Sequence, residues 1–262
     1  MTAFLEALGA RTLRWLTSLG HAGYFFADLV RFSPSALRRF NLVVAQVHAI
    51  GNRSLVIILA SGLAVGFVLA LQMYYALVTY GAAESLGLVV NLALVRELGP
   101  VVAGLLFASR AGSAITAEIG LMKTTEQLAA MEMMAVDPLA RIVAPRFWGG
   151  VVSMPLLAAL FSIMGVFGAY VVGVRLIGLD AGTFWGNMRA GIDLWPDVTN
   201  GIIKSAVFGV AVSLIAVFEG YDAKPTAEGV SAATTRTVVG ASLAILALDF
   251  ILTVFMFRGL GI

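Results

Sequence analysis

The chain has 262 residues, of which 60% are hydrophobic and only 12% are charged, and its mean hydropathy is +0.95. Soluble domains carry about 25% charged residues, so this composition excludes a water-facing globule and predicts an all-α polytopic membrane protein with one membrane domain over residues 1–262. The formal net charge is only +2 and cysteine is absent, which excludes disulfides and thiolate metal sites.

Residues 1–52 contain no apolar stretch long enough to cross a bilayer, and we expect interfacial amphipathic helices here. Apolar residues recur at near-helical spacing at Leu5, Leu8, Trp15, Leu16 and Leu19. A second helix is predicted to begin at Ser33-Pro34, an N-cap followed by a first-turn proline, and to end at Gly51. Helices lying in the headgroup layer and helices packed on the rest of the chain both fit this pattern.

Five apolar stretches in residues 53–262 reach the roughly 20 residues that a membrane-spanning helix needs. The predicted spans are approximately Ser54–Val78, Leu88–Ala108, Phe147–Val174, Gly201–Phe218 and Val238–Phe257. With a cytoplasmic N-terminus, only Arg175, Arg189 and Arg258 of the 17 lysines and arginines fall on the outer side, while Arg96 and Lys204 lie inside apolar stretches. Because basic residues concentrate in cytoplasmic flanks, the sequence predicts a cytoplasmic N-terminus and an outer C-terminus.

The first span contains Gly62 and Gly66 in a G-x-x-x-G spacing. Small residues at this spacing let two helices approach closely. The partner helix can belong to a second copy or to the same chain, and the motif does not distinguish the two.

The second span contains two adjacent charges, Arg96 and Glu97, followed by Gly99 and Pro100. An arginine at mid-membrane costs about 2.5–3.5 kcal/mol on insertion scales, and Pro100 removes the donor to the Arg96 carbonyl. Broken backbone at this depth is tolerated where it lines a wet cavity, so we predict a polar cavity beside residues 96–100, in which Arg96 suits a phosphate or a carboxylate. The alternative is pairing with charges on neighbouring helices, although adjacent residues point about 100° apart and are not expected to face one partner.

A short cytoplasmic helix is predicted between the second and third spans. Thr124 and Gln127 have the spacing of a capping box, and Asp137-Pro138 is expected to end the helix. Its methionines, at positions 131, 133 and 134, provide an adaptable apolar surface that can fit a partner's groove. The alternative is that this helix packs back on the membrane-spanning bundle of the same chain.

Two further charges and an aromatic group stand in the second half of the chain. Lys204 near the start of the fourth span and Asp249 in the fifth are predicted to form a structural ion pair; a proton relay, or a Lys204 that reaches the headgroups alone, are the alternatives. Phe184, Trp185 and Trp195, between the third and fourth spans, suit an aromatic belt at the outer interface.

No motif in the sequence indicates catalysis. It has no G-x-x-x-x-G-K-[ST] loop and no H-E-x-x-H, and its two histidines, His21 and His48, precede the first span. We therefore expect no catalytic residue, no metal site and no nucleic-acid partner. Work against a gradient would draw its energy from a partner or from coupled ions.

Two stretches, RELGP at 96–100 and EQLAAMEMMAVDP at 126–138, together with FEGYDAKPTAEGVSAATTRTVV and LDFILT, closely resemble the MlaE family. The resemblance implies a permease subunit of a bacterial ATP-binding-cassette (ABC) system that moves glycerophospholipids between the inner and outer membranes and maintains outer-membrane lipid asymmetry. It implies a homodimer in the inner membrane, with ATP and Mg on a cytoplasmic ATPase subunit and no cofactor in this chain. The further partners it implies are a STAS-domain protein and a periplasmic hexamer of mammalian-cell-entry (MCE) domains.

The resemblance also assigns residues to roles. Lipid would bind in a cavity at the homodimer interface, at positions Leu69, Tyr74, Tyr80, Arg96 and Glu97. The segment from Glu126 to Val136 would be the coupling helix, with ATPase contacts at Glu126, Gln127, Leu128, Met131, Glu132 and Met134. The direction of transport stays open.

Two other functions compete with this interpretation. An ion-coupled secondary transporter would favour paired intramembrane carboxylates and inverted repeats, and the sequence has no detectable repeat. A non-transporting membrane scaffold predicts a dry bundle in which Arg96 and Glu97 form internal pairs.

Overall fold

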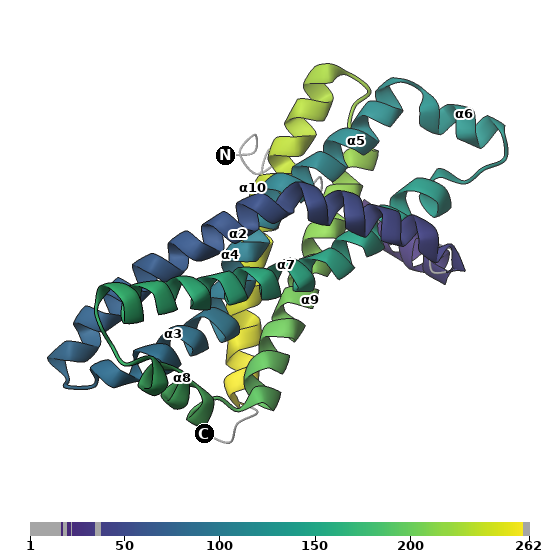
Figure 1. Ribbon diagram of the computed structural model, residues 1–262. Helices are drawn as coiled ribbons and strands as arrows, with labels where there is room; N and C mark the ends of the chain where they lie inside the picture. Colours follow the sequence, from purple (N-terminus) through teal and green to yellow (C-terminus); the bar gives the residue numbers. More distant parts are fainter. Residues whose placement is uncertain (1–16, 18–19, 22, 35–37, 259–262) are drawn as a thin grey trace, which may run out of the picture.

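The computed structural model describes residues 17, 20–21, 23–34 and 38–258, and this part of the chain consists of helices joined by short turns (Figure 1). Within these residues, five helical stretches are long and apolar enough to cross a membrane: Phe40–Thr79, Ala83–Thr124, Leu139–Leu176, Asp197–Asp222 and Ala227–Met256. They confirm the five predicted spans. Each is longer than predicted, because the helices continue past the apolar residues into polar flanks.

The first span is one helix, α2 (Phe40–Thr79), of 40 residues and therefore about 60 Å long. Gly51 lies inside α2, so the prediction that it ends a helix is wrong. A glycine inside a helix costs only about 1 kcal/mol, and the apolar residues on both sides continue the pattern. The expected boundary between interfacial helices and bundle, at residues 52 and 53, thus falls within a continuous helix.

The helical segment 23–34 packs on the bundle. Phe25 and Leu29 are buried, and the Phe25 ring lies 5.5 Å from the Phe218 ring. Ser33 is inside this segment and its hydroxyl donates to the Leu29 carbonyl, so the predicted N-cap at Ser33 is wrong. The Trp148 indole N–H donates to the same hydroxyl at 2.9 Å. The earlier apolar stripe, Leu5 to Leu19, lies outside the described residues.

The second span is a continuous run of helix with two π-helical turns, η2 and η3. Its parts are η1 (Ala83–Ser85), α3 (Leu86–Ala93), η2 (Leu94–Leu98), α4 (Gly99–Phe107), η3 (Ala108–Gly112) and α5 (Ser113–Thr124). At η2 the Gly99 N–H donates to the Leu94 carbonyl, five residues back. The predicted break at Gly99-Pro100 is therefore wrong, because the wider turn accommodates the proline without ending the helix.

The remaining helices complete the bundle and define its two ends. They are α6 (Gln127–Met133), η4 (Leu139–Val143), α7 (Ala144–Tyr170), η5 (Val171–Leu176), α8 (Ala181–Ala190), α9 (Leu194–Asp222) and α10 (Ala227–Arg258). Helices α6 and α8 lie at opposite ends of the long helices (Figure 1), which we call the α6 end and the α8 end.

Helix α8 lies between the third and fourth spans, where only an aromatic-rich connection was expected from the sequence. Asp180 caps it, with the Thr183 N–H donating to Asp180 Oδ2 at 2.7 Å, and this hydrogen bond lowers the pKa of the Asp180 carboxyl. Phe184 is buried against Tyr170, whereas Trp185 is more than one-third exposed. The Trp195 side chain is outside the described part.

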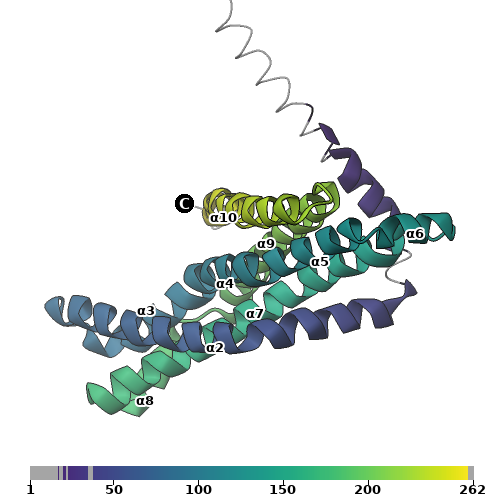
Figure 2. The ribbon, with the colours of Figure 1, turned by 90° about the horizontal axis from the view of Figure 1, so that it is seen from above.

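Helices α2 and α7 lie side by side (Figure 2) and meet through glycines. A Cβ on Gly66 would clash with the Gly165 carbonyl oxygen, and one on Gly62 would lie 2.7 Å from the Phe161 carbonyl oxygen. The G-x-x-x-G motif is thus used within the chain. The last span is the least covered: 11% of its most apolar window is buried, against 50% for the fourth span.

Candidate functional site

The π turn η2 directs Arg96 toward the beginning of α9. Arg96 Nε donates to Asp197 Oδ1 at 2.7 Å, and Nη2 donates to the same oxygen. The Asp197 side chain is 2% exposed and that of Arg96 is 33% exposed. Nη1 of Arg96 makes no hydrogen bond to any described residue. One edge of the guanidinium is therefore anchored, and the other is open.

The neighbouring Glu97 joins a second set of contacts, centred on Lys204. Lys204 Nζ lies 2.5 Å from Glu97 Oε2, 3.1 Å from Asp249 Oδ1 and 2.7 Å from Thr253 Oγ1. An ammonium group has three N–H donors, so all three are satisfied. The Lys204 side chain is 1% exposed, and it connects η2, α9 and α10 at one point.

We call the five charged residues Arg96, Glu97, Asp197, Lys204 and Asp249 the α9 cluster. It contains two cations and three carboxylates, so one negative charge is in excess. The two cluster carboxylates with access to solvent are Glu97, 37% exposed, and Asp249, 24% exposed. The buried members are thus compensated, and the excess charge lies on the accessible side of the cluster.

Only part of this arrangement was predicted from the sequence. The Lys204–Asp249 contact is present, but Glu97 and Thr253 join it. Arg96 and Glu97 both face α9, contrary to the expectation that adjacent residues diverge, because Asp197 and Lys204 stand seven residues apart, two turns on one helix face. A π turn also narrows the angle between successive side chains. The spacing of Asp197 and Lys204 was the signal that could have revealed this pairing.

The internal pairs are those that the scaffold hypothesis predicted, but they do not seal the site. The side chains of Arg96, Glu97 and Asp249 stay 33%, 37% and 24% exposed. The α9 cluster is therefore a paired network with a polar edge open to a ligand.

The other proposed lipid positions lie on or just after α2. Leu69 and Tyr74 are half-buried against the hydrophobic core, and Tyr80 follows the end of α2 with 84% of its surface exposed. No hydrogen bond or ion pair joins these three to the α9 cluster in the described part of the chain. Within one chain, the five predicted lipid-site residues therefore form two separate groups.

The predicted cytoplasmic helix is present as α6, but its ends differ from expectation. Glu126 precedes it with a φ of 58°, and the Thr124 hydroxyl donates to the Gly120 carbonyl, so the predicted capping box is wrong. Thr124 still belongs to α5, whose last turn offers its hydroxyl an acceptor. The helix ends at Met133, before the predicted Asp137, whose carboxylate instead accepts the Leu139 N–H at 2.8 Å.

The residues predicted to couple to an ATPase divide into an inner and an outer set. Leu128 is buried and Met131 is half-buried, whereas the remaining four face solvent: Glu126, Gln127, Glu132 and Met134. Met133 and Met134 are 84% and 68% exposed. Lys123, just before α6, donates to the Tyr221 carbonyl at 2.7 Å. Helix α6 is thus tied to the bundle on one side and presents methionines on the other.

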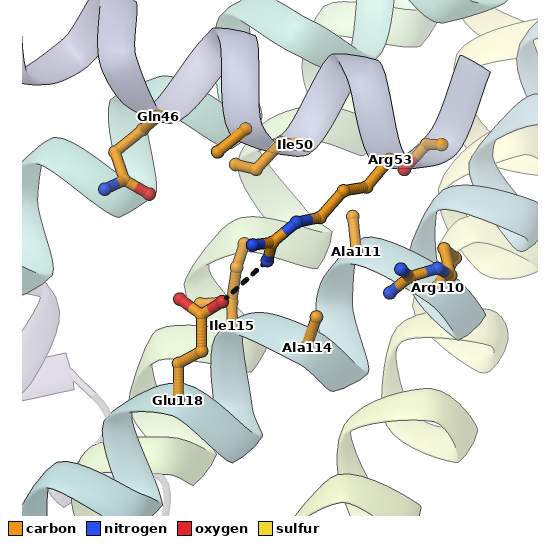
Figure 3. Close-up of a pocket in the computed structure, with 10 residues that line it drawn as sticks. Gln46, Ile50, Arg53, Arg110, Ala111, Ala114, Ile115 and Glu118 are labelled. Carbon is orange, nitrogen blue, oxygen red and sulfur yellow. Dashed lines mark hydrogen bonds and ion pairs between the residues drawn. The ribbon is translucent and has the colours of Figure 1, made fainter.

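A second group of charges lies toward the α6 end and was missed by sequence reasoning. Arg53 of α2 and Arg146 of α7 both contact Glu118 of α5, at 3.3 Å each; we call these three the Glu118 cluster. Figure 3 shows Arg53 and Glu118 pointing toward each other across a small pocket, with Arg110 on its rim. The Glu118 cluster therefore joins α2, α5 and α7 toward the α6 end.

Comparisons with known proteins give the family. The model of the family described as "Permease MlaE" matches residues 43–255. The chain is 54% identical over 254 residues to the intermembrane phospholipid transport system permease protein MlaE of Haemophilus influenzae, covering 97% of both chains. It is 34% identical, over 97% of both chains, to a probable ABC transporter permease protein of Rickettsia bellii.

A more distant relative is the chloroplastic protein TRIGALACTOSYLDIACYLGLYCEROL 1 of Arabidopsis thaliana, 30% identical over 82% of this chain and 61% of that protein. The match to the family model includes nearly all of the five spans and contains the four stretches on which the resemblance was based. This multi-pass membrane protein therefore belongs to the MlaE family of permeases.

Proposed function

We propose that this chain is the permease subunit of an ABC system that transports phospholipids between the inner and outer membranes and maintains outer-membrane lipid asymmetry. The observation that carries the proposal is the 54% identity, over 97% of both chains, with a Haemophilus influenzae protein whose name gives intermembrane phospholipid transport. The Rickettsia relative, a probable ABC transporter permease, supports a partner ATPase. ATP and Mg would bind to that partner.

The transported lipid is proposed to occupy a cavity between two copies of the chain. Leu69, Tyr74 and Tyr80 would contact its acyl chains, with Arg96 and Glu97 near its headgroup. The poorly covered face of α10 supplies apolar surface for the second copy. Because the α9 cluster carries one excess negative charge, a headgroup with both a phosphate and a cation suits it better than a bare anion: phosphate on the open edge of Arg96, cation on Glu97.

Helix α6 is proposed to dock into the ATPase subunit, which places the α6 end in the cytoplasm and the α8 end on the periplasmic side of the bacterial inner membrane. Its support is the pair of exposed methionines, Met133 and Met134, on a short helix outside the spans. We further propose a STAS-domain protein beside the ATPase and a periplasmic hexamer of MCE domains at the α8 end, both from the family resemblance.

The two proposed sites share one continuous helical run, Ala83–Thr124, which holds η2 near one end and leads directly into α6 at the other. Movement of α6 with the ATPase would tilt this run and displace Arg96 and Glu97 together. Such a rigid-body motion is a common means of coupling two distant sites.

A non-transporting membrane scaffold is the second candidate, and the internal pairs of Arg96 and Glu97 favour it. The two functions differ in one measurement: ATP-dependent movement of phospholipid between vesicles by the assembled complex. A scaffold would retain its partners and move no lipid.

The test of the lipid site is substitution of Arg96 in that assay. Arg96→Ala should weaken transport while the complex still assembles. Because this change leaves buried Asp197 without its partner, the matched double variant Arg96→Gln/Asp197→Asn removes both charges and keeps hydrogen-bonding groups in place. Unchanged transport by the correctly assembled double variant would remove Arg96 from the mechanism.

The test of the ATPase contact uses Met134, whose side chain is exposed, so that its substitution should leave the fold intact. Met134→Glu should release the ATPase subunit during purification, because it places a charge in an apolar contact. Met134→Leu preserves the apolar surface and should retain the subunit. Equal retention by both variants would contradict docking through this side of α6.

A further inference from the structure

An apolar groove lies between η2, α4, α7 and α9. It consists of two adjoining cavities, of about 250 Å³ and 340 Å³, which share Val95 and Val198. The first is lined mainly by small or branched apolar residues, among them Ala159 and Ile163 of α7 and Gly201 of α9. Arg96, Glu97, Lys204 and Asp249 do not line either cavity, so the groove is distinct from the open edge of the α9 cluster.

The second cavity carries the groove to the α8 end, where its lining becomes polar. Asn91 of α3 and Arg189 of α8 lie there, with Asp197 at the beginning of α9. Asp197 is already engaged by Arg96 and by the Asp193 N–H. Arg189 is exposed and makes no hydrogen bond or ion pair with the described residues. The groove therefore has one uncompensated cation at its α8 end and apolar walls elsewhere.

The chemistry of the groove selects an elongated amphiphile with an anionic end. The guanidinium of Arg189 can bind phosphate oxygens through two parallel N–H groups. The apolar part of the groove is lined by α7 and α9, within the membrane-spanning segments. The two cavities together fall in the range of about 300–1,000 Å³ that is usual for ligand sites. The polar end of the groove thus lies at the helix ends, where the headgroup of a membrane lipid would be. The apolar end lies toward the middle of the helices, where its acyl chains would be.

We infer that the groove binds one glycerophospholipid from the leaflet at the α8 end, with its phosphate on Arg189 and an acyl chain beside Ala159 and Ile163. This inference goes beyond the proposed function, because it places a lipid outside the cavity between two copies. It depends on the membrane placement of the five spans.

The test is photo-crosslinking of the assembled complex in phosphatidylcholine vesicles that contain a phosphatidylglycerol with a diazirine on one acyl chain. Peptide mapping should locate label on residues 158–163 of α7 and 198–205 of α9. Arg189→Gln should lower this labelling about tenfold, the size expected when a charge-assisted hydrogen bond is lost. Arg175→Gln is the matched control, because Arg175 is also exposed near the α8 end and lines neither cavity.

A second variant tests the apolar part of the groove. Ala159→Trp should fill it and abolish labelling of the α9 peptide, whereas Leu156→Trp, on an exposed position of the same helix outside the groove, should leave labelling unchanged. Absence of label from both peptides in the unmodified complex, or equal losses in Arg189→Gln and Arg175→Gln, would overturn the inference. Labelling is measured without ATP, so failure of transport and failure of this site are read separately.

Discussion

The α9 cluster and the Glu118 cluster join helices with the same kinds of charges, but they differ in their access to water. Lys204 and Asp197 are 1% and 2% exposed, whereas Arg53 and Glu118 are 62% and 43% exposed. A buried charge that loses its partner cannot be hydrated, and an exposed one can. Loss of a partner should therefore destabilise the fold strongly in the α9 cluster. In most of the Glu118 cluster the same loss should change the free energy of unfolding only slightly.

The largest effect should come from Lys204→Met. The change leaves Glu97 and Asp249 close together without a cation, and breaking a buried ion pair costs about 3–5 kcal/mol. Thermal unfolding of the purified protein in detergent should show the loss. The triple variant Lys204→Met/Glu97→Gln/Asp249→Asn removes the unpaired charges and should recover most of the stability. No recovery would mean that packing around the lysine, and not its charge, holds the three helices.

A smaller effect is expected from Glu118→Gln. Exposed ion pairs contribute roughly 0–1 kcal/mol each, and salt screens them, so the unfolding temperature should fall slightly and the difference should shrink at high ionic strength. The same salt series on Lys204→Met is the comparison. If Glu118→Gln instead lowered the unfolding temperature as much as Lys204→Met, and independently of salt, the Glu118 cluster would behave as a buried ion pair. The reason would be Arg146, whose side chain is only 10% exposed.

The smallest effect is expected at Asp180, a fully exposed carboxylate that caps α8. Its pKa is lowered by the Thr183 N–H, so its contribution is fully present above the unfolded value of about 3.9 and is lost as the pH falls through the lower folded value. Amide exchange of α8 should therefore increase below about pH 4 in the unmodified protein. Asp180→Asn, which keeps a capping side chain, should remove this pH dependence, and an unchanged acid response would point to another carboxyl.

The five spans could be predicted from the sequence because each holds about 20 apolar residues, but their lengths could not. Residues up to 51 were expected to form a separate interfacial helix, and residues 113–124 to belong to the connection after the second span, but both segments continue the helices of the spans beside them. Helix α8 was missed for a different reason. It has only 10 residues. It is stabilised by the contact of Phe184 with Tyr170 of α7, which is too far away in the sequence for a local pattern to reveal.

The candidate site was predicted in part. The cost of placing Arg96 and Glu97 in a membrane marked them correctly as residues with a special environment, and the Lys204–Asp249 contact followed from matched depth in antiparallel spans. The partner of Arg96 was not found, because Asp197 follows a proline and was assigned to a loop before the fourth span. The proline break at residue 100 was overestimated, since nothing in local sequence distinguishes a π turn from a broken helix.

The contact between Gly66 and the Gly165 carbonyl has a practical consequence for any test of the proposed homodimer. A bulky residue introduced at Gly62 or Gly66 would push α2 away from α7 within each polypeptide. A monomer obtained in this way would report damage to the individual subunit. Mutagenesis aimed at quaternary structure should instead begin on the outward apolar residues of α10, such as Leu243 and Phe250, which are 63% and 71% exposed.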